Sequence, residues 1–278
     1  MVNLVLHFHR SGEQLLAAIK MAKTKSDDRY EVALDLLIKE GARMKAVPYN
    51  GFWQPIKYPW HVLTMMNHFF ETLRGIKKGK NVQVAKSAVL KGNVVLAEGV
   101  KVMENAVISG PAYIGKNSVI ATNALVRLSE IGENCVIGFG SEVARSHVGN
   151  DVWTHTNYVG DSVIGNNCSF GSGTVTGNLR LDEANISVNI EGEKVDSGIT
   201  KLGLITGDNV RCGINTSFMP GIKIGKNSFI GAGIVVAEDI ADNKFAYGRT
   251  ELIVKDNKAK LDQKKREEMR SKVKSQKA

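Results

Sequence analysis

The sequence has few of the residues that cross-link, kink or anchor a chain. Its 278 residues include three cysteines and five prolines, and 6% are aromatic. Cys135, Cys168 and Cys212 show no partner spacing for a disulfide or a zinc site, which is typical of a protein in a reducing cytosol. No stretch is long and apolar enough to cross a bilayer, and residues 1–7 turn polar too soon for a secretory signal. We therefore expect a cytoplasmic protein with no membrane partner and no metal.

Positive charge is concentrated at one end of the chain. The formal net charge is +9, and residues 249–278 hold eleven Lys or Arg against five Asp or Glu, which is +6 of that total. Aromatic residues are not interleaved with these charges, so the pattern does not favour nucleic-acid binding. We expect a charged tail that is largely helical from about Asp256 to Lys274 and makes surface or subunit contacts.

What the chain does contain is a six-residue repeat. Every sixth residue is a branched aliphatic at Val84, Leu90, Leu96, Val102, Ile108, Ile114, Ile120 and Val126. A small or β-branched residue stands two positions before each. Six residues make one side of a three-sided prism, a short strand plus a corner, so the period predicts a mainly β chain that winds into a parallel β-helix.

The interruptions of the repeat are informative. Its frame slips by one residue after Val126 and several times more before Thr176, which we attribute to shortened corners. It breaks at Asn178 and returns at Thr206. Residues 178–203 must therefore leave the prism, and residues 186–195 within them predict a small hairpin. Long loops expelled from compact folds usually have a function, so we expect one here.

The flanking segments divide the chain into three parts. Residues 76–248 form the β-helix, and residues 249–278 form the tail. Residues 1–75 carry no repeat. In this first part we expect helices over Glu13–Met21 and Tyr30–Gly41, a strand at Lys45–Tyr49 and a helix from Tyr58.

The first part resembles a fragment of another fold. Asn50-Gly-Phe-Trp-Gln-Pro-Ile-Lys-Tyr-Pro-Trp is similar to the closing segment of the sugar-1-phosphate nucleotidylyltransferase domain. Pro55 stands where that family places a metal-binding Asp, and its Gly-rich nucleotide loop is missing. The resemblance implies a small α/β remnant without nucleotidyl transfer. We expect this remnant to cap the open end of the β-helix.

The β-helix carries a second resemblance, over residues 80–248. His155-Thr-Asn-Tyr158-Val-Gly-Asp-Ser-Val-Ile-Gly and Phe170-Gly-Ser-Gly-Thr-Val-Thr-Gly-Asn178 resemble ordered motifs of the bifunctional glucosamine-1-phosphate acetyltransferase / N-acetylglucosamine-1-phosphate uridylyltransferase family, in its archaeal type. Gly138-Phe-Gly-Ser-Glu142-Val-Ala-Arg145 resembles the segment upstream. The resemblance implies a left-handed β-helix and a homotrimer. It also implies acetyl transfer from acetyl-CoA to the amine of glucosamine or galactosamine 1-phosphate, in UDP-N-acetylglucosamine biosynthesis.

Site residues follow from this resemblance. Spacing alone makes His155 a surface residue; the resemblance makes it the general base. Substrate contacts implied by the family are Tyr158, Asn178 and Glu142. Candidate phosphate ligands are Arg127, Arg145 and Lys201, each equally consistent with a solvated corner. Candidate residues of the CoA groove, or simple corner residues, are Gly213, Gly231 and Ala232. Ala184 and Ser187 stand where archaeal members carry lysines, so affinity or sugar preference is expected to differ.

Other functions stay open. One is acyl transfer to a nucleotide-linked amino sugar. Another is a non-catalytic partner that binds sugar phosphate and regulates a complete nucleotidylyltransferase. A β-helical carbonic anhydrase would need three zinc-binding histidines, and His147 and His155 are the only two in the repeat region, so we reject this function.

Overall fold

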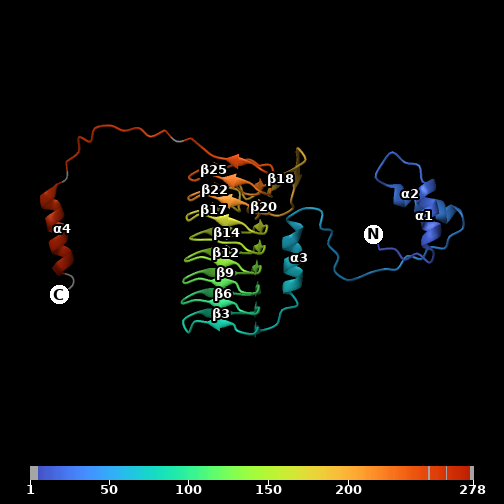
Figure 1. Cartoon of the computed structure of the whole chain (residues 1–278), viewed down its shortest axis with the longest axis horizontal. Helices are drawn as coiled ribbons and strands as arrows, with labels where there is room; N and C mark the ends of the chain where they lie inside the picture. The colour runs from blue at the N-terminus through green and yellow to red at the C-terminus, as the bar shows by residue number, and fades with distance from the viewer. Residues whose placement is uncertain (1–5, 250, 261, 276–278) are drawn as a thin grey trace. The chain divides into compact units, whose positions relative to one another are not determined.

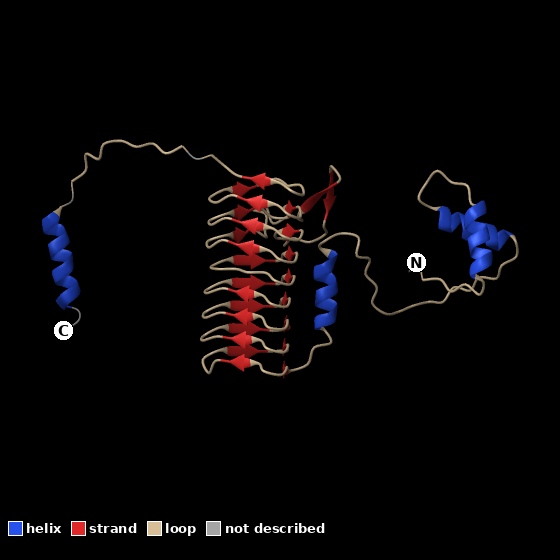
Figure 2. Cartoon of the chain, viewed as in Figure 1, coloured by secondary structure: helices blue, strands red, loops and turns tan. Residues whose placement is uncertain are grey.

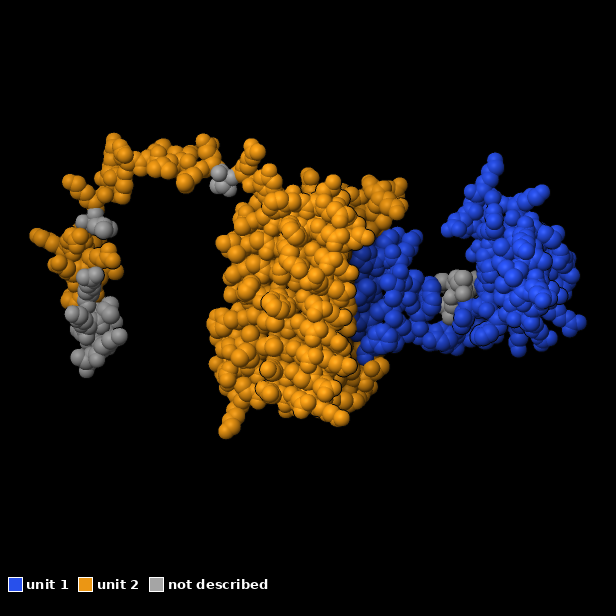
Figure 3. Space-filling view, viewed as in Figure 1, with its two compact units in different colours: residues 1–69 blue, residues 70–278 orange. Residues whose placement is uncertain are grey.

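The computed structural model describes residues 6–249, 251–260 and 262–275. The chain divides into two compact units, Met1–Phe69 and Phe70–Ala278, which Figure 3 colours separately. In the first unit α1 (Gly12–Met21) and α2 (Arg29–Lys39) pack through Ala18, Ala22 and Ala33. Helix α3 (His61–Phe70) ends at the boundary.

One expectation for this unit is wrong. Residues 45–49 form no strand; they are exposed and pair with no other strand in the described chain. An isolated strand has no partner for its backbone groups, and Pro48 lacks an N–H to offer one. The expected capping of the β-helix by residues 1–75 stays a prediction.

The second unit contains the β-helix, a stack of short parallel strands with three faces (Figures 1 and 2). Face A consists, in stacking order, of β1 (Ile76–Lys78), β4 (Val94–Leu96), β7 (Ala112–Ile114), β10 (Glu130–Ile131), β13 (His147–Val148), β15 (Val163–Ile164), β20 (Ile205–Thr206) and β23 (Lys223–Ile224). Face B consists of β2 (Gln83–Val84), β5 (Lys101–Val102), β8 (Val119–Ile120), β11 (Val136–Ile137), a bridge at Trp153, β16 (Ser169–Phe170), β21 (Arg211–Cys212), β24 (Phe229–Ile230) and β26 (Phe245–Ala246). Face C consists of β3 (Val89–Lys91), β6 (Val107–Ser109), β9 (Leu125–Arg127), β12 (Glu142–Ala144), β14 (Tyr158–Gly160), β17 (Val175–Thr176), β22 (Ser217–Phe218) and β25 (Val235–Val236).

This architecture confirms the predicted left-handed parallel β-helix. Repeat positions such as Ile108, Ile114 and Ile120 are fully buried, and they stack on their equivalents in adjacent coils. The three cysteines are free and buried, as their repeat positions predict. Because each coil buries little by itself, the core is continuous along the stack.

The frame slips correspond to shorter coils. On face C, Val107 pairs with Leu125, whereas Glu142 pairs with Tyr158 after a shorter stretch of chain. One residue is lost where face C turns into face A: Gly110-Pro111 fills this corner in one coil, and Leu128 alone fills it in the next. Another residue is lost where face B turns into face C, between Trp153 and Tyr158. These shortened corners determine where the polar residues described below lie.

One coil of the β-helix is interrupted by an insertion. Val163 pairs with Ile205, so this one coil carries a long insertion, which leaves after β17 and returns before β20. The insertion contains the predicted hairpin, β18 (Ser187–Ile190) and β19 (Glu193–Asp196). Ile186 and Val188 are buried at its base, so the hairpin is docked rather than free.

The tail differs from the expectation at its start. Helix α4 (Gln263–Ser275) begins well after Asp256. The carboxylate of Asp262 accepts the backbone N–H of Lys265 at 3.1 Å, which is an N-terminal cap. Nearer the predicted start, Oδ1 of Asn257 accepts the backbone N–H of Ala259 at 2.9 Å, which forms a turn that competes with helix. Residues 250, 261 and 276–278 of the predicted tail lie outside the described residues.

Candidate active site

The corner between faces C and A places the polar side chains of Arg145, Asp161 and Asn178 in one column along the stack. Leu128, Arg145 and Asp161 each fill this corner alone in successive coils, with φ of 52°, 51° and 49°. The left-handed conformation costs energy in a residue other than glycine, and a bonded side chain offsets part of that cost. In the next coil the same corner opens into the insertion that begins at Asn178. Arg145, Asp161 and Asn178 are therefore neighbours along the stack.

Asp161 and Arg145 form a bidentate ion pair. The Nε of Arg145 donates to Oδ1 of Asp161 at 2.6 Å, and Nη2 donates to Oδ2 at 2.6 Å. The carboxylate side chain is 8% exposed and the guanidinium 27%. The hydrogen bonds that Arg145 donates to Asp161 raise the pKa of Arg145 above its ordinary value, and the nearby Tyr158 adds to this shift. The ion pair therefore favours the charged form of Arg145.

Asn178 connects this pair to Tyr158. Its Nδ2 donates to the hydroxyl oxygen of Tyr158 at 3.1 Å and also to Oδ2 of Asp161. Gly160 makes room for this contact, because a Cβ there would lie 2.5 Å from the Tyr158 hydroxyl and 2.8 Å from the Asn178 amide nitrogen. The four side chains form one hydrogen-bonded network at the root of the insertion.

The hydrogen-bond donors and acceptors that the network does not use are available to a ligand. The NH2 group of the Asn178 amide is used by Tyr158 and Asp161, and no donor to its carbonyl oxygen is found among the described residues, so that oxygen can accept from a ligand. The hydroxyl oxygen of Tyr158 accepts from Asn178, and no acceptor for its proton is found in the described part of the chain. The network thus offers one acceptor, on Asn178, and one donor, on Tyr158.

Two of the predicted ligands bind each other on face C. Glu142 is in register with Tyr158, one coil away. Its Oε1 accepts from Nε of Arg127 at 2.7 Å, and both side chains are about one-third exposed. Arg127 and Arg145 are thus each paired with a carboxylate, which offsets the positive charge that the sequence alone suggests for this face.

His155 lies at the other shortened corner, between faces B and C, three residues before Tyr158. Its side chain is exposed, and its backbone N–H donates to Oδ1 of Asn157 at 2.7 Å. The buried Asn157 amide also donates to the carbonyls of Gly171 (2.8 Å) and Thr174 (3.1 Å), which fixes the corner to the next coil. The His155 ring has no hydrogen bond or ion pair with any residue that the structure describes, and it faces solvent.

No hydrogen bond joins the remaining predicted residues to the four side chains of the network in the described part of the chain. Lys201 is exposed at the base of the insertion, opposite Leu179. Gly213 and Gly231 lie in adjacent coils of the His155 corner, next to Ala232. A Cβ on Gly213 would lie 2.6 Å from the backbone nitrogen of Ala232, so coil stacking alone requires this glycine.

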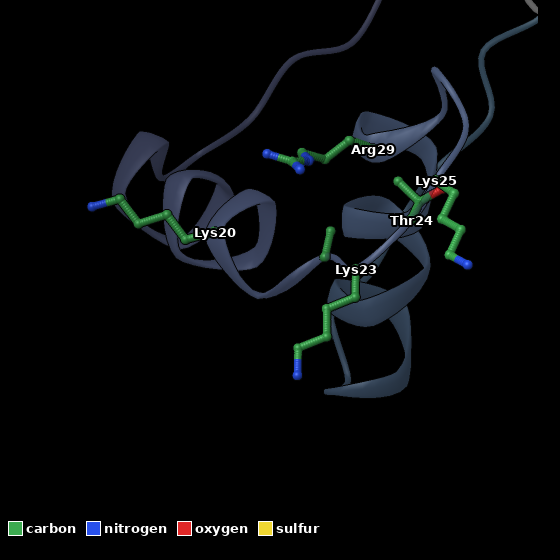
Figure 4. Close-up of a pocket in the computed structure, with 6 residues that line it drawn as sticks. Lys20, Lys23, Thr24, Lys25 and Arg29 are labelled. Carbon is green, nitrogen blue, oxygen red and sulfur yellow. The ribbon is translucent and has the colours of Figure 1, made fainter.

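A separate cavity in the first unit carries no comparable arrangement. It has a volume of about 620 Å³ and is lined by Lys20, Lys23, Lys25 and Arg29, with Thr24. Figure 4 shows that the three lysines point away from one another. Among the described residues no three His, Cys, Asp or Glu side chains are placed to hold a metal.

Known proteins provide the next observation. No protein-family model matches the chain. The bifunctional protein GlmU of Methanocaldococcus jannaschii is 41% identical over 237 residues, which is 83% of this chain and 57% of that protein. The GlmU of Methanococcus maripaludis strain C5 is 42% identical over 224 residues, 80% of this chain and 53% of that protein. The chain is related to the archaeal bifunctional GlmU proteins. It spans little more than half their length, and an alignment this long includes Tyr158 and Asn178 whichever end it omits.

One further curated relative agrees with this kinship. A bifunctional sugar-1-phosphate nucleotidylyltransferase/acetyltransferase of Sulfurisphaera tokodaii is 36% identical over 216 residues, 77% of this chain and 53% of that protein. Among solved structures, a UDP-N-acetylglucosamine acyltransferase is 20% identical, with a TM-score of 0.47, and covers 59% of this chain and 63% of its own. The comparison therefore rests on the GlmU relatives, whose sequence identity to this chain is about twice as high.

Asp161 is the residue that inspection of the sequence overlooks. It stands inside the His155 motif but is not among the candidate ligands. The signal that reveals it is coil length. Arg145 and Asp161 directly follow Ala144 and Gly160, which end two paired strands in register, so the two side chains occupy the same corner of successive coils.

Proposed function

We propose that the chain is an acetyl-CoA-dependent N-acetyltransferase acting on a hexosamine 1-phosphate, and that it performs no nucleotidyl transfer. The observation that carries this proposal is the Tyr158–Asn178–Asp161–Arg145 network. Its Tyr158 follows the exposed His155 by three residues on the same coil. The kinship with bifunctional GlmU proteins supports this class of reaction.

The chemistry needs a base, an oxyanion donor and a binding site for the sugar. His155 takes a proton from the substrate ammonium, and the free amine attacks the thioester carbonyl carbon. The tetrahedral oxyanion then forms, and a backbone N–H of a coil is suited to stabilise it. The C–S bond breaks and the CoA thiolate leaves with the proton held by His155, while the nitrogen gives its second proton to solvent as the amide forms. Tyr158 and Asn178 offer a donor and an acceptor to the sugar.

A strip free of side chains continues from His155 along the stack. By the register of face B, the residues equivalent to His155 in the next three coils are Gly171, Gly213 and Gly231. We expect the extended pantetheine arm of CoA to lie along this strip, beside Ala232. The glycines serve coil packing as well, so this assignment is tested separately below.

The sugar phosphate requires cations that are not fully neutralised. Arg127 and Arg145 keep N–H groups beyond those bound to Glu142 and Asp161, and Lys201 has an exposed ammonium. Glu142 lies beside Tyr158 and is suited to a sugar hydroxyl. We expect a cytoplasmic protein. We also expect a homotrimer in which neighbouring subunits share the site, because exposed apolar residues such as Val175 and Val235 on face C are suited to a subunit contact.

One observation favours a second candidate, acyl transfer to a nucleotide-linked amino sugar. Both arginines near Tyr158 are paired with carboxylates, so the local charge is close to zero. A phosphomonoester dianion gains less from such a site than from unpaired arginines, whereas a sugar linked to a diphosphate depends less on charge at this position.

A thiol-release assay separates these functions. The protein is mixed with acetyl-CoA and, in turn, with glucosamine 1-phosphate, galactosamine 1-phosphate and a nucleotide-linked amino sugar. We expect release of CoA with a hexosamine 1-phosphate and formation of its N-acetyl product by mass spectrometry. Turnover only with the nucleotide-linked sugar supports the second candidate, and turnover with none contradicts an enzyme of this kind.

A further inference from the structure

The orientation of the Asn178 amide is determined by Asp161. A carboxylate accepts hydrogen bonds and has none to donate, so the group that Asn178 turns toward Oδ2 of Asp161 must be its NH2. The same NH2 reaches the Tyr158 hydroxyl at 3.1 Å. The carbonyl oxygen of Asn178 consequently points away from both.

Asp161 is itself held firmly. Its side chain is 8% exposed and bonded to Arg145 through both oxygens. Its backbone N–H donates to the carbonyl of Ala144 at 2.8 Å, and its carbonyl accepts from Gly203 at 2.7 Å. These bonds tie Asp161 to the coil before it and to the end of the insertion, so the carboxylate cannot turn away from Asn178.

We propose that Asp161 is a positioning residue that makes the site selective for an amine over a hydroxyl at the reacting carbon of the sugar. This inference rests on the proposed function. A substrate ammonium donates hydrogen bonds and accepts none, so it requires the carbonyl of Asn178. A hydroxyl both donates and accepts, so it binds either orientation of the amide. A fixed amide thus favours the amino sugar.

The test compares two ligands that differ at this one group. Dissociation constants for glucosamine 1-phosphate and glucose 1-phosphate are measured by calorimetry on the full chain and on Asp161→Asn. In the variant a single carbonyl oxygen remains for both Arg145 and Asn178, so the Asn178 amide is no longer held in one orientation. We expect the wild-type preference for the amine, about 10–100-fold for a charged hydrogen bond, to fall to within about threefold.

Asp161→Asn is expected to fold. Asn117, Asn134 and Asn167 occupy corners of this β-helix with φ of 57°, 56° and 51°, close to the 49° of Asp161. The matched control is Glu130→Gln, which removes the carboxylate bonded to His147 between adjacent coils of face A. It should leave both dissociation constants unchanged. Asn178→Ala, which leaves the Arg145–Asp161 pair intact, should lose the preference as well, and retention of the preference in this variant would also overturn the proposal.

A double variant separates orientation from charge. Asp161→Asn leaves Arg145 unneutralised, and its charge would also repel an ammonium. We expect Asp161→Asn with Arg145→Gln to remain unselective; recovery of the preference would assign the effect to charge and overturn the proposal. Retention of the wild-type preference in Asp161→Asn also overturns it and leaves the proposed function intact. A wild type that binds neither sugar phosphate contradicts both.

Discussion

The amide nitrogen of Asn178 lies 3.1 Å from the hydroxyl oxygen of Tyr158, although the two residues belong to different coils. The contact joins the first residue of the expelled insertion to the strand that follows the His155 corner. It shows that the insertion begins at the polar network. The interrupted part of the repeat is thus where the β-helix brings reactive groups together.

The two arginine–carboxylate pairs should contribute differently to the free energy of unfolding of the protein. Arg145→Ala leaves the 8%-exposed Asp161 without its cation, which is expected to cost about 2–4 kcal/mol of unfolding free energy. Arg127→Ala breaks a pair whose side chains are 35% and 31% exposed, and solvent screening limits the cost to about 1 kcal/mol. Urea unfolding measures both. Equal losses would contradict the distinction between them.

The buried thiol of Cys135 predicts a loss of folding stability at alkaline pH. Burial raises the pKa of the Cys135 thiol to about 11 from an ordinary value of 9.0. The unfolded thiol ionises first, so the stabilisation is complete below about pH 9 and is lost as pH rises toward 11. We expect Cys135 to account for a loss of about 2 kcal/mol over that range.

Serine is the matched replacement for Cys135. Ser118 fills the same position one coil earlier, and its hydroxyl donates to the Gly132 carbonyl just as the thiol of Cys135 contacts that of Gly149. Cys135→Ser should fold and lose less stability between about pH 9 and pH 10.5 in urea unfolding. An identical pH dependence in both proteins would refute the role of the thiol.

Gly213 distinguishes coil packing from cofactor binding. Gly213→Ala places a Cβ 2.6 Å from the backbone of Ala232, and such overpacking is expected to cost about 1–3 kcal/mol. Gly12→Ala, where nothing lies within 4 Å of the new Cβ, is the control and should be neutral or slightly stabilising. Thermal unfolding compares the two. An unchanged melting temperature with a raised KM for acetyl-CoA would instead indicate a ligand contact alone.

Lys201 should act through its charge. Lys201→Ala is expected to raise the KM for a hexosamine 1-phosphate about threefold to tenfold with little change in kcat, because an exposed ammonium contributes mainly to binding. The difference should shrink at about 0.5 M salt, where screening is strong. Lys194→Ala, on strand β19 of the hairpin, is the control. A drop in kcat without a change in KM would contradict a phosphate contact.

The sequence predicts much of this fold because the repeat is local. Six-residue spacing of residues such as Ile108 and Ile114 reports one side of the prism, and its break at Asn178 reports the insertion. The absent strand at Lys45–Tyr49 could not be foreseen, since a strand depends on a partner elsewhere. The ion pairs of Arg127 and Arg145 depend on the summed lengths of whole coils, so a one-residue slip decides which carboxylate lies above each guanidinium.

The base assignment is open to the most direct measurement. His155 is exposed and its ring is unbonded in the described structure, so His155→Ala should leave the melting temperature unchanged. Initial rates of CoA release with acetyl-CoA and glucosamine 1-phosphate are compared for the two proteins at saturating substrate. We expect kcat to fall about 10²–10⁴-fold, the usual contribution of a positioned base. A wild-type rate in a folded His155→Ala variant would contradict the mechanism.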